Sequence, residues 1–159
     1  MAKPALDTKT VTATSVDITR QLGTTLGQHL QPATIVVLSG DLGAGKTQLA
    51  AAIAQDLNIN TPITSPTFAI LKHYAEGRIP LNHMDLYRLE DATQLEDIDF
   101  YDLLRPCEPA ATLIEWGEMF TAVTDHADLL ITIRITGASE RSIQLDALTP
   151  RGKELLAHV

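Results

Sequence analysis

The eight consecutive residues from Gly40 to Thr47 carry the strongest chemical signal in the sequence. They read GDLGAGKT and match the pattern G-x-x-x-x-G-K-[ST] without deviation. An apolar, β-branched run (TIVVLS) precedes the loop, and an Ala-rich stretch that favours a helix (KTQLAAAIAQDL) begins at Lys46. A strand, a glycine-rich loop and a helix in this order form the context in which the pattern holds phosphate. We therefore favour a phosphate loop over a glycine-rich turn that serves only packing.

The chemistry expected of this loop is the binding of a nucleoside triphosphate. Only a backbone without side chains can wrap closely enough to direct consecutive N–H groups at several negative charges, and the helix start adds partial positive charge. We predict that Lys46 bridges the β and γ phosphates and that the Thr47 hydroxyl ligates Mg²⁺. The residues expected to contact the nucleotide are Asp41, Leu42, Gly43, Ala44, Gly45, Lys46, Thr47 and Gln48.

A magnesium site also needs an acid at the end of a neighbouring strand, and two residues compete for that role. Glu115 ends ATLIE, the more apolar candidate strand and therefore the one expected beside the loop. Asp85 ends LNHMD, in which Asn82 and His83 are unusual for a strand buried on both faces. We favour Glu115 as the acid on the metal side and Asp85 as a second acid near the γ-phosphate or the attacking water. The reverse assignment stays open, and so does a surface position without a role for either acid.

A segment rich in threonine and proline, residues 61–67 (TPITSPT), lies between the loop helix and the strand that ends at Asp85. Its composition suits an extended loop. In phosphate-binding NTPases such a segment can sense the γ-phosphate and change order on hydrolysis, which makes Thr64, Ser65 and Thr67 candidate switch residues. A polar connection without a role is the alternative.

Short β-branched runs alternate with helical patterns along the chain, which predicts an α/β fold. The expected strands are residues 10–14, 34–39, 68–74, 79–86, 111–116, 129–135 and 142–148. The expected helices follow Ser15 and span 46–57, 91–104 and 150–158. A turn (AEGR) joins two of these strands as an antiparallel hairpin. We expect residues 1–159 to form a single P-loop NTPase-like domain, a three-layer sandwich with a mixed, mostly parallel sheet and helices on both faces.

The chain is acidic, with 20 Asp and Glu residues against 12 Lys and Arg residues and a net charge of -8. Nucleic-acid binding draws on basic side chains, so we expect tRNA to be reached only indirectly, through a partner. One cysteine, Cys107, excludes an intramolecular disulfide. The histidines lack H-x-x-x-H spacing, and no apolar run has the length of a signal peptide or a membrane span. We expect a cytoplasmic protein without zinc or membrane contact.

Four segments together resemble a known family more specifically than the loop alone. They are GDLGAGKT at 40–47, TSPTF at 64–68, HMDLYRL at 83–89 and LIEWGE at 113–118. In order and spacing they closely resemble the bacterial tRNA threonylcarbamoyladenosine biosynthesis ATPase family, TsaE (formerly YjeE), over nearly the whole chain. The DLYR and IEW elements are the most diagnostic. Gly117 is a departure, because members often have another small residue or proline there.

This resemblance implies a small P-loop ATPase that works with the TsaD and TsaB proteins. Those partners transfer a threonylcarbamoyl group to the adenosine next to the tRNA anticodon, and the ATP cycle supports turnover of their complex. The resemblance implies that Lys46 and Thr47 hold phosphate and Mg²⁺, that Glu115 is the metal-side acid and that Asp85 is the other functional acid. It also implies nucleotide-responsive or partner-facing positions at Thr64, Ser65, Thr67, Arg88 and Trp116. From the residues alone, a place in the core is the default for Trp116, and a ring that faces the site or a partner is the alternative.

The expected reaction is hydrolysis of Mg-ATP with Lys46, Asp85 and Glu115 as catalytic residues. Arg88 is a candidate arginine finger but is not placed unambiguously, so we expect slow turnover alone and faster turnover with partners. A small-molecule kinase stays open as an alternative, although the arginines form no lid-like cluster. A non-catalytic assembly factor gated by ATP is a second alternative. No guanine-reading N-K-x-D segment is present, so the preference for ATP rests on the resemblance.

Overall fold

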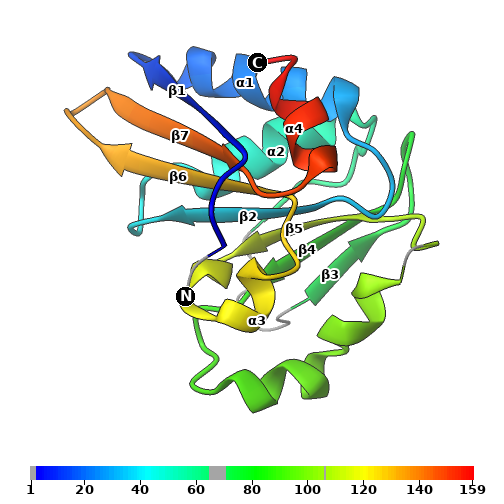
Figure 1. Cartoon of the computed structure of the whole chain (residues 1–159). Helices are drawn as coiled ribbons and strands as arrows, with labels where there is room; N and C mark the ends of the chain where they lie inside the picture. Colours follow the sequence, from blue (N-terminus) through cyan, green and yellow to red (C-terminus); the bar gives the residue numbers. More distant parts are fainter. Residues whose placement is uncertain (1–2, 65–70, 106) are drawn as a thin grey trace.

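A single seven-stranded sheet organises the chain, in the order β1-β7-β6-β2-β5-β4-β3 (Figure 1). Figure 1 shows a computed structural model, and the structure describes residues 3–64, 71–105 and 107–159. The strands are β1 (Asp7–Ala13), β2 (Ile35–Gly40), β3 (Leu71–Tyr74), β4 (Leu81–Asp85), β5 (Ala111–Glu115), β6 (Leu129–Ile135) and β7 (Arg141–Ala147). The predicted mixed sheet is confirmed, but only three of the six strand pairs among the described residues are parallel, so the expected mostly parallel pairing is wrong.

Parallel pairing is confined to the four central strands, β6, β2, β5 and β4. The predicted hairpin of β3 and β4 forms an antiparallel edge. A second antiparallel portion, formed by β1, β7 and β6, was not anticipated. It arises because β6 and β7 are joined by a short turn, which forces them to run in opposite directions, and β1 then pairs along β7.

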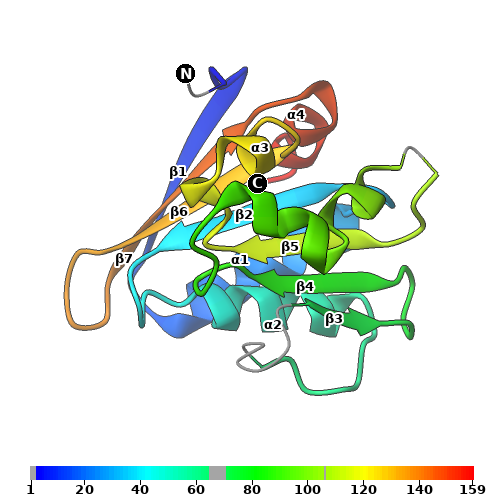
Figure 2. The ribbon, with the colours of Figure 1, turned by 90° about the horizontal axis from the view of Figure 1, so that it is seen from below.

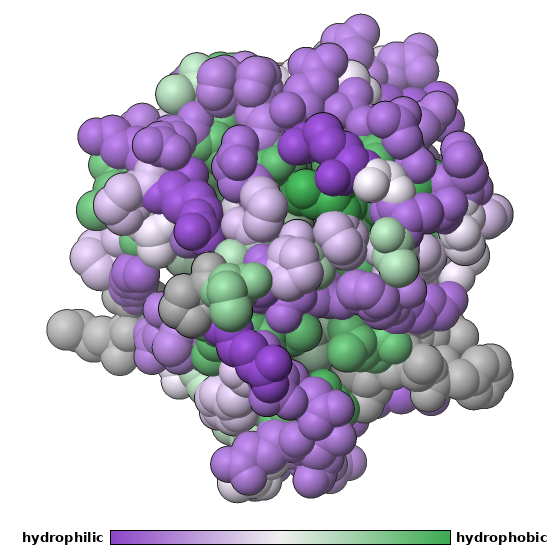
Figure 3. Space-filling model, turned by 90° about the vertical axis from the view of Figure 1, so that its right-hand side faces the viewer, coloured by the Kyte–Doolittle hydropathy of each residue, from purple (hydrophilic) through white to green (hydrophobic). Residues whose placement is uncertain are grey.

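Helical segments cover both faces of the sheet (Figure 2). The α-helices are α1 (Val16–His29), α2 (Lys46–Asp56), α3 (Thr121–Thr124) and α4 (Pro150–Leu156). One apolar cluster packs α1, α2 and α4 against the sheet, and a second fills the opposite face under α3. Within the described ranges no helix is long and apolar enough to cross a lipid bilayer. The face in Figure 3 is mainly hydrophilic, with small apolar groups between polar side chains.

The helix predicted over residues 91–104 is wrong as a single α-helix. The segment forms two 3-10 helices, η1 (Ala92–Ile98) and η2 (Phe100–Leu104), separated by Asp99, whose φ of 59° is left-handed. This break lets both Leu95 and Phe100 enter the core, although they are too far apart around an α-helix to share a face. Tyr101, the next residue, is exposed.

The sequence also did not indicate two helical elements after β5 or the burial of strand β4. A 3-10 turn, η3 (Gly117–Met119), and the short α3 follow β5. Strand β4 is buried even though it carries polar residues, and the sequence-based doubt about Asn82 and His83 in a buried strand was wrong. Asn82 meets His73 at 2.6 Å and His83 meets a carboxylate, so both side chains bring their own polar partners.

The position of α2, and with it the loop before this helix, depends on close packing against α1. A methyl group built on Gly23 of α1 would lie 2.4 Å from the Cβ atom of Ala52 and 3.2 Å from the carbonyl oxygen of Leu49. Neither neighbour is the end of a flexible side chain. The absence of a side chain at Gly23 therefore sets the distance between the two helices.

We predict that Gly23→Ala lowers the free energy of unfolding by about 1–2 kcal/mol. Overpacking costs about 1–3 kcal/mol and outweighs the helix propensity of alanine, which contributes at most about 1 kcal/mol. Urea denaturation measures the difference. Gly137→Ala is the matched control, because a methyl group there meets its nearest neighbour at 3.4 Å. Equal stability of Gly23→Ala and the parent protein would contradict this packing account.

Candidate functional site

The loop between β2 and α2 is sharply bent. Gly40, Gly43 and Gly45 have φ values of 147°, 79° and 115°, a left-handed region that favours glycine. A side chain at Gly43 or Gly45 would meet no atom within 4 Å, so these two glycines are needed for backbone conformation and leave open space above the loop. Helix α2 begins at Lys46, and its first N–H groups lack partners within the helix and can face an anion.

The Lys46 side chain folds back over the start of this loop and is only 5% exposed. Its Nζ donates hydrogen bonds to the carbonyl oxygens of Gly40 and Asp41. The same atom lies 4.0 Å from the centroid of the Trp116 ring, a cation–π distance. Backbone oxygens and an aromatic face therefore hold the charged Nζ beside the loop. There it can exchange these contacts for contacts with another partner.

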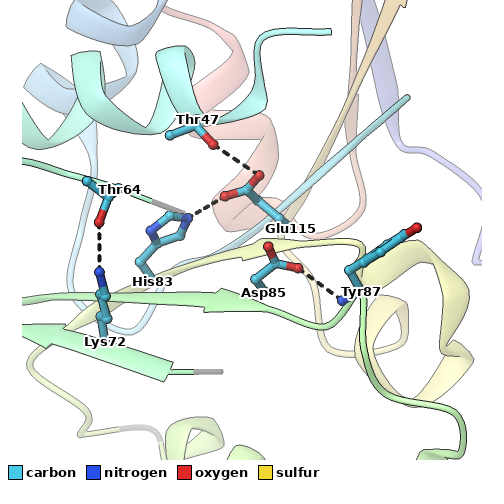
Figure 4. A network of polar contacts seen from close by, with 7 residues as sticks. All are labelled: Thr47, Thr64, Lys72, His83, Asp85, Tyr87 and Glu115. Carbon is cyan, nitrogen blue, oxygen red and sulfur yellow. Dashed lines mark hydrogen bonds and ion pairs between the residues drawn. The ribbon is translucent and has the colours of Figure 1, made fainter. Parts of the chain in front are cut away.

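A polar chain of three residues crosses from α2 to β4 (Figure 4). The Thr47 hydroxyl donates to Oε1 of Glu115 at 3.4 Å, and Oε2 of Glu115 lies 2.6 Å from Nε2 of His83. Glu115 ends β5, which pairs directly with β2, and Leu38 is its register partner there. The predicted central position of the ATLIE strand is therefore correct. Glu115 is only 3% exposed, so these two contacts stabilise its buried carboxylate.

Asp85 lies one strand farther from the loop than Glu115. The two acids are register partners at the ends of β4 and β5. Oδ1 of Asp85 accepts a hydrogen bond from the backbone N–H of Tyr87 at 3.0 Å. Because parallel strands end at the same edge of a sheet, both acids reach the same side of the loop, and Glu115 is the one in contact with Thr47.

Two hollows flank the loop and share three of its residues and Gln48 of α2. The first, of about 350 Å³, is lined by Asp41, Leu42, Gly43, Ala44, Gly45, Lys46, Thr47, Gln48, Asp85, Glu115 and Trp116. The structure thus brings together every residue predicted to contact the nucleotide and both predicted acids. The second hollow, of about 400 Å³, is lined by Ser15, Val16, Thr19, Gly43, Ala44, Gly45, Gln48, Ala138, Ser139 and Arg141. A ligand that spans the loop can extend from one hollow into the other.

Comparison with known proteins identifies the family. Residues 13–143 match the family model described as Threonylcarbamoyl adenosine biosynthesis protein TsaE. The chain belongs to this family. A protein of Nostoc sp. named tRNA threonylcarbamoyladenosine biosynthesis protein TsaE is 39% identical over 127 residues, which are 79% of this chain and 78% of that protein. The Bacillus subtilis protein of the same name is 36% identical over 121 residues, or 76% and 74% of the two chains.

A solved structure supports the same fold. The crystal structure of Bacillus subtilis YdiB matches with a TM-score of 0.72 and 27% sequence identity. The match covers 95% of this chain and 93% of that one. The α/β arrangement with a mixed sheet is therefore shared across nearly the full length of both proteins.

The residues predicted to respond to the nucleotide or to face a partner lie in different environments. The Thr64 hydroxyl accepts a hydrogen bond from Nζ of Lys72 at 2.7 Å, while Ser65 and Thr67 lie outside the described residues. Trp116 lines the first hollow, and its ring lies 4.9 Å from that of Tyr87. Arg88 is exposed, and among the described residues it is not part of the lining of either hollow.

Three residues in or beside the site were not predicted from the sequence. Arg141 of β7 donates from Nε to the carbonyl oxygen of Ala44 at 3.1 Å and so holds the loop from the side of the second hollow. No local pattern marks it, because it comes from a distant strand. His83 did carry a signal, as a polar residue in an apolar strand. Glu118 lies within η3, near Ser39 and Lys46, and no recognisable signal marks it.

Glu118 of η3 is half-buried beside the loop. Burial raises the pKa of Glu118 above its ordinary value because the carboxylate loses hydration. A backbone N–H at Glu118, the Ser39 hydroxyl and the positive charge of Lys46 oppose this increase. Oε2 of Glu118 is buried and has no hydrogen-bond partner among the described residues. The folded state therefore binds the Glu118 proton more tightly than the unfolded chain does.

We predict that Glu118→Gln raises the melting temperature at pH 7, because glutamine stays neutral and avoids the cost of a buried charge. A raised pKa stabilises the fold fully below the ordinary value of 4.5, and this contribution is lost as the pH rises through the folded-state pKa. The advantage of Glu118→Gln should therefore shrink as the pH is lowered toward 4.5. Calorimetry from pH 4 to 8 measures this, with exposed Glu96→Gln as the control. A Glu118→Gln variant that melts below the parent protein at pH 7 would refute the prediction.

Proposed function

We propose that this chain binds and hydrolyses Mg-ATP and thereby supports threonylcarbamoyl modification of the tRNA adenosine next to the anticodon. In this proposal its ATP cycle drives turnover of a TsaD and TsaB partner complex. The observation that carries the proposal is the bent loop of residues 40–45 with Lys46, Thr47 and Glu115 gathered around one hollow. Membership of the TsaE family supports the place in tRNA modification.

The proposed architecture is a P-loop NTPase-like three-layer sandwich. Helices on both faces of the sheet and a phosphate loop between a central parallel strand and α2 support it. The proposed nucleotide lies with its phosphates in the first hollow and its base toward Ser15 and Arg141 in the second. The choice of ATP over GTP rests on the family resemblance.

The residues present fit a magnesium ion. Oγ1 of Thr47 and Oε1 of Glu115 are 3.4 Å apart, and hard cations take oxygen ligands. Thr47 and Glu115 would hold the ion, with Asp85 in the same hollow as the alternative acid. When bound, Mg²⁺ neutralises charge on the phosphate oxygens.

Backbone and side-chain groups of this chain carry out the other steps of the proposed reaction. The N–H groups of the loop and the first turn of α2 orient the phosphates and stabilise charge on the transferring phosphoryl group. Lys46 exchanges the carbonyl oxygens of Gly40 and Asp41 for phosphate oxygens, a short movement within the same loop. The acid that does not serve the metal positions the attacking water, and by the preferred assignment that acid is Asp85.

The proposed partners explain how an acidic chain can act on tRNA. With a net charge of -8, this protein gains little from direct contact with phosphates of nucleic acid. Its partners would hold the tRNA, and their docking would accelerate ATP turnover. An arginine supplied by this chain or by a partner can contribute roughly 10³- to 10⁵-fold in rate.

We predict different losses for two variants of the site. Lys46→Ala should weaken ATP binding by about 10- to 100-fold, because a charge-assisted hydrogen bond contributes roughly 1.5–3 kcal/mol. Glu115→Ala should retain nucleotide binding and lower turnover by about 100-fold, as expected when one stabilising group is removed from a reaction centre. Calorimetric titration and phosphate release measure the two effects, and exposed Lys153→Ala is the matched control for the lysine.

The same variants, added to TsaD, TsaB and tRNA, test the role in modification. Parent protein should release phosphate faster with the partners than alone, and neither site variant should support repeated modification. Equal rates with and without partners would contradict the partner role. Full modification with Glu115→Ala would show that hydrolysis is dispensable and favour an assembly factor gated by ATP.

A further inference from the structure

His83 is a fully buried histidine next to the proposed metal ligand. Its exposed fraction is 0%, and its Nε2 lies 2.6 Å from Oε2 of Glu115. We propose that His83 is a positioning residue: it fixes the Glu115 carboxylate so that the other oxygen faces Thr47 and the bound Mg-nucleotide. This inference rests on the proposed function, because it gives the Glu115 site a supporting group that the proposed reaction requires.

The sheet register explains why this histidine reaches Glu115 and not another group. His83 of β4 pairs with Leu113 of β5, and Glu115 is the next residue of β5 on the same face. Leu113 packs in the cluster under α1 and α2, so His83 and Glu115 also point to that face. Thr47 lies at the start of α2 above them. The three side chains therefore line up across β4, β5 and the helix, as Figure 4 shows.

The contact divides the two oxygens of one carboxylate between two different tasks. Among the described residues, Oε2 is engaged by His83 and Oε1 by the longer contact to the Thr47 hydroxyl at 3.4 Å. A buried carboxylate without a partner is costly, so the short contact to His83 determines which rotamer Glu115 adopts. Oε1 is then left on the side of the hollow, where exchange of the weaker contact for a metal ion costs little.

The other nitrogen of His83 indicates that the ring is not retained for packing alone. Nδ1 is buried, and no described residue hydrogen-bonds to it. A buried polar atom without a partner costs free energy that an apolar side chain of similar volume would avoid. The compensating interaction is the one at Nε2, which acts on Glu115. In metal sites, partners that orient a ligand in this way commonly change metal affinity or activity by 10- to 100-fold when they are replaced.

A pair of amide substitutions separates positioning from a structural role. The glutamine of His83→Gln can place an N–H near the position of Nε2, whereas the asparagine of His83→Asn is one methylene shorter and cannot reach Glu115. The measurement is the affinity of each protein–ADP complex for Mg²⁺ by calorimetric titration, together with ADP affinity in EDTA. Exposed His126→Asn is the control for loss of an imidazole. Phosphate release at varied Mg²⁺ concentration provides the corresponding kinetic measurement.

We expect His83→Asn to weaken Mg²⁺ binding by about 10- to 100-fold with ADP affinity in EDTA unchanged, and His83→Gln to recover most of the loss. Unchanged Mg²⁺ affinity in His83→Asn would overturn the inference while leaving the proposed function intact. Equal losses in both variants, accompanied by loss of ADP binding in EDTA, would assign His83 a structural role and also overturn it. Parent protein that binds no Mg-ADP would instead refute the proposed function, and the inference would fall with it.

Discussion

The parallel pairing of β2 with β5 is the constraint on which the site depends. Parallel strands end at the same edge of a sheet, so the loop after Gly40 and the carboxylate of Glu115 emerge side by side. Helix α2 covers the face of the sheet to which Glu115 points, because the apolar residues of α2 pack against that face. Its first turn therefore places Thr47 over Glu115. One register, Leu38 opposite Glu115, fixes the geometry of the centre.

The site contains buried polar groups that stability alone would not select, and these groups lie around the loop. Lys46 at the start of α2, His83 in β4 and Glu115 in β5 are buried polar groups, and Glu118 keeps a carboxylate partly out of water. Each group carries a desolvation cost that its polar contacts must offset. Strained or costly groups gather where a protein binds or reacts, because the ligand supplies the missing interactions. The charge of Lys46 and the oxygens of Glu115 are complementary to a phosphate and a cation.

The sequence predicted those parts of the fold that depend on local pattern. The strand–loop–helix unit, the hairpin and the central position of ATLIE follow from hydrophobic runs and turn residues, and the structure agrees. The break at Asp99 could not be seen, because the decision to bury both Leu95 and Phe100 is made by tertiary packing. The polar residues of β4 suggested that this strand is exposed, because local sequence does not reveal their partners on neighbouring strands. Arg141 contacts the loop from β7, two strands away from β2 in the sheet, and no local sequence pattern encodes this contact.

The proposed function requires main-chain amides of the loop to hold the phosphates of the nucleotide. Amide NMR spectra recorded during titration with Mg²⁺ and a non-hydrolysable ATP analogue test it most directly. If these amides hold the phosphates, the largest shifts will fall on Gly43, Gly45, Lys46 and Thr47. Saturation with the analogue that leaves these four resonances unmoved would contradict it.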